Sequence, residues 1–322
     1  MIYCNALCHF VAYLYCKPHF IIKFMTKKNI TYIWLWLLLA SIMGISAKPA
    51  FAGDKTRAAL QAQYSGLSDE LAHNQFKRPI YLDSTESSNQ IKGDIYALID
   101  YPFATVNAAL NDPVKGPDNW CDVMMLHLNT KYCRATTTPS ATTLAMSVGK
   151  KYDQPLEDAY HLDFTYHAKA ATADYFAVEL AADSGPLGTR DYRILLEAVS
   201  VEGKQTFMHL TYAYAYGFAG RIALKSYLAT AGSSKVGFTI NAKQGNNQPD
   251  YIKGVRGMVE RNTMRYYLAI DAYLSALNIA PAIRTERRLT TWFDATEQYP
   301  RQLHEVERDE YLAMKRSEYQ RQ

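Results

Sequence analysis

Cysteine is scarce in this 322-residue chain, and an excess of positive charge is confined to its first 52 residues. Residues 1–52, called the leader below, hold five of the 35 lysines and arginines and none of the 31 acidic residues. The remaining 270 residues therefore carry 30 basic and 31 acidic groups, a net charge of −1. This part of the chain lacks the positive field that would attract nucleic acid or an anionic surface, so we expect no nucleic-acid partner.

The sequence also lacks the short motifs of common enzymes. It contains no Gly-x-Ser-x-Gly segment, which argues against an α/β-hydrolase. The glycine-containing segments 185–188 and 217–220 do not have the spacing of a phosphate-binding loop and indicate turns. We therefore expect no catalytic residue and no cofactor, and the protein is predicted not to be an enzyme.

One cluster has residue types that bind metal ions. His161, Asp163 and His167 project from the same face of a predicted strand. Six residues separate the two histidines, which is about 20 Å along a strand at the standard rise. A single ion cannot bridge that distance, so we expect a solvated sheet face and no metal site.

The leader has the pattern of a signal peptide. Lys27 and Lys28 precede an apolar run over residues 30–45, and Ala50-Phe51-Ala52 supplies the small-x-small site that signal peptidase recognises. We expect residues 25–52 to be a signal peptide cleaved after Ala52, and the protein to be exported to the periplasm. An uncleaved anchor is the alternative, although the run is short for a full span. We expect Met25 to be the true start, with residues 1–24 as upstream sequence.

Two cysteines remain after cleavage. Cys121 and Cys133 form an even pair in an oxidising compartment, which favours a disulfide. Closing so short a loop would contribute about 3 kcal/mol on the chain-entropy model. Two buried free thiols are the alternative.

Residue periodicity predicts an α+β fold. Residues 53–79 contain an N-terminal helix, residues 123–128 fit a buried strand, and the threonine-rich residues 136–143 form a loop or a ragged edge. Strands with alternating side chains fill the middle of the chain. A long helix follows over residues 250–277, with a stripe of apolar and aromatic positions at steps of three or four. This helix must bury its stripe against the sheet.

Three segments carry a resemblance to a known superfamily. Residues 93–106 (GDIYALIDYPFATV), the pair Trp120-Cys121 and residues 257–262 (GMVERN) resemble the first strand and helix, the central tryptophan and the closing helix of START-like (SRPBCC) domains. The resemblance covers residues 80–283 and implies a helix-grip fold, in which a long C-terminal helix closes a curved antiparallel sheet. Members of this superfamily bind lipids, sterols or other apolar molecules between sheet and helix, and a minority are cyclases or aromatases.

The closing helix and one strand supply the candidate ligand-binding residues. They are Asn262, Thr263, Tyr266, Tyr212 and Tyr214. Tyrosine offers an apolar wall with a hydroxyl group, and a polar residue on a buried stripe must find a partner. A hydrogen bond from helix to sheet, or simple core packing, is the alternative for each. The charged positions beside the stripe are expected to face solvent: Glu260, Arg261, Arg265 and Asp271.

Residues 284–322 form a charged helical extension. We expect it to be a solvent-exposed helix docked through Trp292 and Phe293, with a partner-binding tail as the alternative. The leading functional hypothesis is a periplasmic START-like protein that binds or carries an apolar, lipid-like ligand, which would involve transient membrane contact. The alternatives are a cyclase- or hydrolase-type enzyme using the same cavity, and an envelope scaffold acting through the tail.

Overall fold

The structure is a computed structural model, and it describes residues 50–230, 232–243 and 249–322 of the chain. The predicted signal peptide and upstream segment lie almost wholly outside the described residues. Within the described ranges, no helix is both long enough and apolar enough to cross a membrane.

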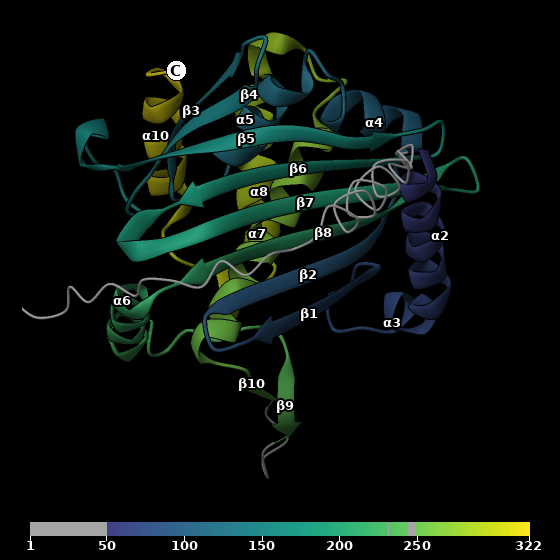
Figure 1. Cartoon of the computed structure of the whole chain (residues 1–322). Helices are drawn as coiled ribbons and strands as arrows, with labels where there is room; N and C mark the ends of the chain where they lie inside the picture. The colour runs from purple at the N-terminus through teal and green to yellow at the C-terminus, as the bar shows by residue number, and fades with distance from the viewer. Residues whose placement is uncertain (1–49, 231, 244–248) are drawn as a thin grey trace, which may run out of the picture. The chain divides into compact units, whose positions relative to one another are not determined.

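Eight strands form one antiparallel sheet, with the order β1-β2-β8-β7-β6-β5-β4-β3 (Figure 1). The strands are β1 (Ile80–Glu86), β2 (Gln90–Ile99), β3 (Thr130–Thr137), β4 (Thr142–Val148), β5 (Tyr160–Ala171), β6 (Tyr175–Ser184), β7 (Thr189–Val201) and β8 (Gln205–Tyr216). From β3 to β8 each strand pairs with the next, and β8 then pairs with β2. Two short strands, β9 (Ile240–Lys243) and β10 (Pro249–Tyr251), pair separately.

Helices cover both faces of the sheet. They are α2 (Ala50–Gly66), α3 (Ser68–Ala72), α4 (Phe103–Leu110), α5 (Gly116–Met125), α6 (Phe218–Ala229), α7 (Gly254–Ser275), α8 (Pro281–Thr296), α9 (Pro300–Leu303) and α10 (Arg308–Tyr319). Two 3-10 turns, η1 (Leu156–Asp158) and η2 (Pro186–Gly188), lie in the loops before β5 and β7. In Figure 1, α5, α7 and α8 lie behind the sheet.

Helix α7 crosses the sheet and packs on β1, β2 and β8. Val259 and Thr263 of the predicted stripe press against Gly93 of β2, where a Cβ atom would collide with the Thr263 hydroxyl. The missing side chain thus lets helix and strand approach closely. The predicted α+β fold, a curved antiparallel sheet closed by a long C-terminal helix, is confirmed. The helix starts four residues later than predicted, because residues 249–251 form β10.

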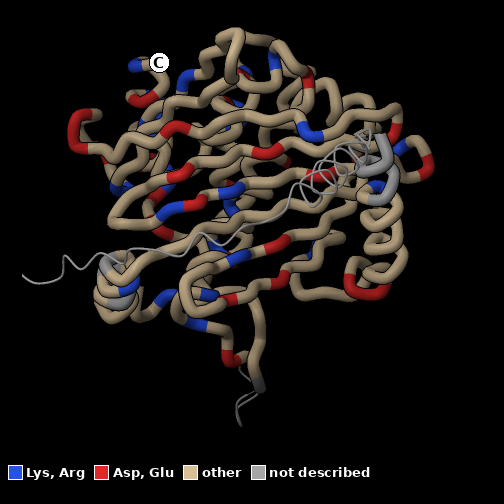
Figure 2. The backbone as a smooth tube through the Cα atoms, in the orientation of Figure 1, with Lys and Arg blue, Asp and Glu red and all other residues tan. Residues whose placement is uncertain are grey.

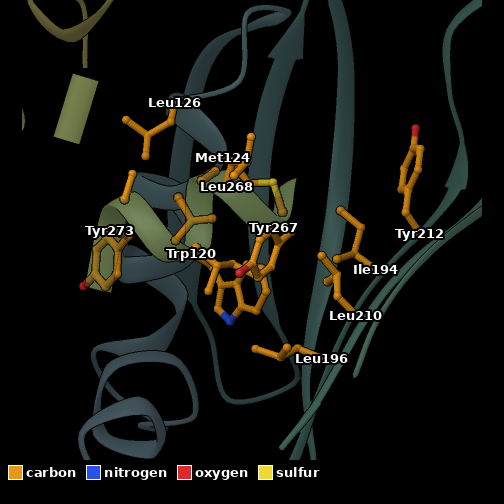
Figure 3. Packing of buried hydrophobic residues seen from close by; sticks show 14 of the residues in the cluster. Trp120, Met124, Leu126, Ile194, Leu196, Leu210, Tyr212, Tyr267, Leu268 and Tyr273 are labelled. Carbon is orange, nitrogen blue, oxygen red and sulfur yellow. The ribbon is translucent and has the colours of Figure 1, made fainter. Parts of the chain in front are cut away.

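The main core lies between the sheet, α5 and α7. In Figure 3, Trp120 of α5 and Tyr267 of α7 point toward inward-facing leucines and isoleucine of β7 and β8, whereas Tyr212 lies apart from them. Trp120 is fully buried, and its indole nitrogen donates to the carbonyl oxygen of Leu110 at 3.0 Å. This hydrogen bond satisfies the polar atom of the largest buried side chain and ties α5 to α4.

One local prediction is wrong. Residues 123–128, predicted as a strand, belong to the end of α5 and the turn after it. A short apolar run suits a buried helix as well as a buried strand, and this run is buried on all sides.

For residues 136–143, the structure shows the edge of the sheet, one of the two predicted alternatives. They contain the ends of β3 and β4, where Thr136 pairs with Thr143, and β3 is the edge strand. The polar threonines mark the exposed end of a hairpin.

The predicted disulfide is confirmed. Cys121 of α5 and Cys133 of β3 are bonded, with Cα atoms 5.2 Å apart and a sequence separation of 12. The bond fixes the helix against the edge strand of the sheet.

The N-terminal helices cover the opposite face of the sheet from α7. Leu60, Tyr64, Leu67 and Leu71 share one face, as the sequence predicts, and pack against Phe207 and its neighbours in a second hydrophobic cluster. The predicted helix 53–79 is divided into α2 and the shorter α3, and it ends at Ala72.

Beside this cluster, the outer face of the sheet is charged, with both signs interspersed along the strands (Figure 2). His209 lies between Asp94 at 2.9 Å and Glu197 at 3.2 Å. Burial disfavours the imidazolium, but the hydrogen bonds that it donates to these two carboxylates outweigh this effect and raise the pKa of His209.

The charged side of α7 is buried, contrary to prediction. Glu260, Arg261 and Arg265 are each 2% exposed or less. Glu260 accepts hydrogen bonds from the backbone N–H of Phe238 at 2.6 Å and of Thr239 at 3.0 Å. Segments before and after the helix cover this side: residues 236–239 supply partners for Glu260 and Arg261, and residues 303–305 supply partners for Arg265. Asp271, the fourth such residue, is half-buried and paired with Arg78.

The predicted docking of the C-terminal extension through Trp292 and Phe293 is confirmed, but the prediction that its helix is exposed is wrong, because Tyr311, Leu312 and Met314 are buried too. Trp292 and Phe293 are buried, and the Trp292 indole donates to the carbonyl oxygen of Arg265 at 3.1 Å. In α10, Glu318 is fully buried between the ammonium groups of Lys131 at 2.8 Å and Lys315 at 2.6 Å. The scaffold hypothesis loses the free tail on which it rested.

Candidate functional site

A cavity with two adjoining lobes opens between the sheet and α7. The larger lobe has a volume of about 490 Å³ and the smaller one about 310 Å³. Tyr212 and Asn262 line both lobes, as do Pro186 and Leu187 of η2. Both volumes lie in the range of small-molecule sites.

Apolar side chains make up most of the wall. In the larger lobe they come from β4 and β5: Met146, Val148, Leu162 and Phe164. In the smaller lobe, Leu224 of α6 and Met258 of α7 take this role. Side chains on the inward face of the sheet therefore line an unfilled space beside the packed core.

A row of tyrosines connects the lobes. Tyr212 and Tyr214 come from β8, Tyr192 from β7 and Tyr266 from α7. The ring centroids of Tyr192 and Tyr214 are 5.2 Å apart, and those of Tyr212 and Tyr266 are also 5.2 Å apart. Burial raises the pKa of Tyr212, Tyr214 and Tyr266, so these hydroxyl groups stay protonated at neutral pH. They can donate and accept hydrogen bonds, but they do not supply a phenolate base.

His127 continues the aromatic row at the far end of Tyr266. Their rings stack with centroids 4.9 Å apart, and the imidazole is 4% exposed. Burial, together with the positive charges of Arg265, Lys315 and Lys151, lowers the pKa of His127 well below its usual value. The neutral ring accepts a hydrogen bond at Nδ1 from the backbone N–H of Asn129, at 3.2 Å, so its proton is on Nε2. Among the described residues, that Nε2–H has no acceptor.

Gln154 is a second donor without an acceptor. Its Oε1 accepts a hydrogen bond from the backbone N–H of Lys150 at 2.7 Å, whereas its buried Nε2 has no partner in the described part of the chain. His127 and Gln154 both line the larger lobe. Buried polar groups are nearly always paired, so two orphan donors on one cavity wall mark positions where water or a bound molecule can supply acceptor oxygens.

Asn129 links these donors to the smaller lobe. Its side chain donates to the carbonyl oxygen of Gly149 at 2.6 Å, and Gly149 packs against Gln154. Asn129 lines both lobes, whereas His127 and Gln154 line the larger one and Lys151 the smaller one. We call the group of His127, Asn129, Gln154 and Lys151 the polar end.

Positive charge is in excess beside the polar end. The carboxylate of Glu305 is bonded by Lys151 at 2.6 Å, Arg265 at 2.8 Å and Lys235 at 3.1 Å. Despite its burial, these cations lower the pKa of Glu305 to about 2. Burial and the charge of Arg265 lower the pKa of Lys151 to about 8, against the opposing effect of Glu305. One carboxylate thus faces three cations, two of which line the cavity.

The structure brings four of the five predicted ligand-binding residues to the cavity. Tyr212 and Asn262 line both lobes, Tyr214 the smaller and Tyr266 the larger. Thr263 lies elsewhere: its hydroxyl donates to the carbonyl oxygen of Val259 at 2.8 Å, within α7. The alternative predicted for this residue was a hydrogen bond from helix to sheet, but the bond stays within the helix, and the side chain contacts the sheet only by packing on Gly93.

The residues that sequence reasoning missed come from other segments. Tyr192 belongs to the strand paired with Tyr212, and alternation along β7 could have placed it on the inward face. His127, Gln154 and Lys151 follow no periodic pattern, because they lie in turns whose position only the fold determines. Within the described residues, no group of histidine, cysteine or acidic side chains could hold a metal ion. His161 and Asp163 form an exposed pair at 3.2 Å.

This is a helix-grip fold. No protein-family model matches the chain, and no curated protein matches its sequence. Among solved structures, the ZhuI aromatase/cyclase from Streptomyces sp. R1128 is similar at 14% identity, over 65% of this chain and 96% of that one, with a TM-score of 0.35. Human StAR-related lipid transfer protein 5 is similar at 7% identity, over 54% and 90%, with a TM-score of 0.30.

A third similar structure is norcoclaurine synthase from Thalictrum flavum, at 9% identity over 45% of this chain and 89% of that one, with a TM-score of 0.32. Likeness at this level carries no argument about function. The fold assignment follows from the strand order and from the position of α7 across the sheet.

Proposed function

We propose that this protein is an exported START-like protein that binds or carries an apolar, lipid-like molecule in the cavity under α7. The observation that carries the proposal is an unfilled cavity that is lined by the tyrosine row and has two hydrogen-bond donors without acceptors, His127 and Gln154, in its wall. An apolar wall with a few convergent polar groups is the usual character of a small-molecule site.

The proposal of export to the periplasm rests on two further features. The leader has the order of basic, apolar and cleavable segments that a signal peptide requires. The bonded pair Cys121–Cys133 suits an oxidising compartment.

The lining favours binding over catalysis. The hydroxyl groups of the tyrosine row stay protonated, and the acidic residue of the lining, Asp158, is solvent-exposed. A general base needs a pKa near the working pH and a position within reach of its proton. One observation supports the cyclase- or hydrolase-type alternative: the neutral imidazole of His127 stacks on Tyr266 inside the cavity. Recovery of a chemically altered ligand after incubation would favour that alternative.

The direct test is native mass spectrometry of the purified protein, followed by solvent extraction of any bound compound. We expect a co-purified apolar molecule, or stoichiometric uptake of one from detergent or lipid. The variant Val148→Trp places an indole in the larger lobe and should lower occupancy while the protein stays folded. Its matched control is Val114→Trp at an exposed site, 79% accessible, which should bind as the unmodified protein does. Equal occupancy in both variants, or no uptake at all, would refute the proposal.

A further inference from the structure

The polar end of the cavity carries more positive charge than its own carboxylate can neutralise. Lys151, Arg265 and Lys235 come from three separate segments and converge on Glu305, which leaves two net positive charges there. The Glu305 and Arg265 side chains are 6% and 3% exposed, whereas those of Lys151 and Lys235 are 27% and 25% exposed, so water screens this charge only in part. A buried excess of one sign is costly unless a counter-charge is bound.

The same end also has donors without acceptors. The Nε2–H of His127 and the side-chain amide of Gln154 both lack a partner among the described residues. A continuous set of contacts joins them: Asn129 is bonded to the His127 ring and to Gly149, and Gly149 packs on Gln154. Lys151 follows Gly149 by two residues. Excess positive charge and free donors therefore meet at one place, and both are complementary to an anion.

We propose that the ligand is an apolar acid, whose compact anionic head, a carboxylate or a phosphate monoester, binds at the polar end with Lys151 as its counter-charge. This inference rests on the proposed function and specifies its ligand. The apolar body would lie along the tyrosine row, from Tyr266 through Tyr212 to Tyr214. The orphan donors of His127 and Gln154 would bond to the remaining oxygens of the head or to an adjoining polar atom.

A neutral ligand fits this end less well. An ester or alcohol could accept hydrogen bonds from the two orphan donors, but it would bring no counter-charge to Lys151. An anion near Lys151 also favours its protonated form, whose pKa burial and the charge of Arg265 lower to about 8. The groups that face Lys151 are Arg265 from α7, Lys235 from the segment before β9, and Glu305 after α9. On its other side, the carboxylates of Asp153 and Glu310 line a pocket together with Lys151. Binding of an acid should therefore weaken as the pH rises from 7 to 9.

The test measures displacement of a fluorescent apolar probe from the full-length protein by four compounds with the same chain: hexadecanoic acid, hexadecyl phosphate, methyl hexadecanoate and hexadecanol. At pH 7 we expect at least one of the two anions to bind about ten-fold more tightly than the neutral compounds, which is the effect of one charge-assisted hydrogen bond. The two anion arms distinguish a carboxylate from a phosphate head. Equal affinity of acids and neutral compounds would overturn the inference while leaving the proposed function intact. Failure of all four to displace the probe would refute both.

A lysine away from the cavity provides the matched control. Lys151→Met should weaken binding of the acid about ten-fold and leave the ester unchanged. Lys204→Met makes the same charge change in the exposed turn between β7 and β8, and should change neither. Unchanged ester binding by Lys151→Met shows that the cavity is intact. Equal losses in both variants would contradict a specific role for Lys151.

Replacing Glu305 should change the affinity for the acid in the opposite direction. The Glu305 carboxylate competes with the ligand head for the same cations. Glu305→Gln should therefore strengthen acid binding severalfold and leave ester binding unchanged. If Glu305 acts only as a structural residue, the variant should weaken both ligands instead, and that result would contradict the proposal.

Discussion

The buried ion cluster in the C-terminal extension makes a sharp prediction about stability. The Glu318 carboxylate accepts hydrogen bonds from Lys131 and Lys315, and all three side chains are fully buried. Lys315 also donates to the carbonyl oxygens of His127 at 3.0 Å and Thr130 at 2.7 Å. The cluster thus holds α10 against the turn that carries a wall residue of the cavity.

Replacing Glu318 with glutamine leaves two buried ammonium groups without a counter-charge. Breaking a buried ion pair by removing one partner typically costs about 3 to 5 kcal/mol. For a protein of this size, each kcal/mol lowers the melting temperature by roughly 2 to 4 °C, so we expect a decrease of roughly 6 to 20 °C. The deficit should shrink as the pH rises from 7 toward 9, because an uncharged lysine needs no counter-ion, and burial already lowers the pKa of Lys315 to about 8.

Thermal and urea unfolding, followed by circular dichroism, measure this effect. The control is Glu310→Gln, which removes the same charge from an exposed position on the same helix and should change stability by less than about 0.5 kcal/mol. If Glu318→Gln unfolds at the temperature of the control, the extension is not packed through this cluster, and our description of the C-terminal segment is wrong.

Three further predictions concern the scaffold of the cavity. Replacing both Cys121 and Cys133 with serine should lower the free energy of unfolding by about 3 kcal/mol, as measured in urea, with no further change on adding reductant. His209→Gln should lower the stability of the protein most below pH 6.5. The loss should become smaller as the pH rises through the raised pKa of His209, because the imidazolium of the unmodified protein then loses its proton. A loss in thermal melts that does not change with pH would refute this. Gly93→Ala should lower the free energy of unfolding by about 1 to 3 kcal/mol, because the new methyl group collides with Thr263. Adding Thr263→Ala should restore part of that free energy. Strictly additive effects of the two substitutions in a double-mutant cycle would contradict the contact.

The sequence predicted the type and order of most elements, but not which faces of these elements are buried by other segments. Periodic patterns placed the inward-facing side chains of the strands, the N-terminal helix and the stripe of α7. They could not show that Glu260, Arg261 and Arg265 are buried, because the segments that cover them are distant in sequence. A charged residue beside a stripe looks the same whether it faces water or a buried partner.

The candidate site was predictable where it follows a regular element. Tyr212, Tyr214 and Tyr266 lie on a strand and a helix whose periods point them inward. The polar end was not predictable, because His127, Gln154 and Lys151 come from irregular turns that only the tertiary structure brings together. Residues 123–128 illustrate a different limit: an apolar run buried on all sides carries no period that separates helix from strand.

Photo-cross-linking tests the central claim, that an apolar molecule occupies the space between the sheet and α7, most directly. A fatty acid carrying a diazirine near the middle of its chain would be bound to the full-length protein, irradiated, and its adducts located by peptide mapping. We expect adducts within β8 (Gln205–Tyr216) and α7 (Gly254–Ser275), and their loss when excess unlabelled acid is present. Adducts confined to the outer helices α2 and α3, or insensitive to the competitor, would contradict the account.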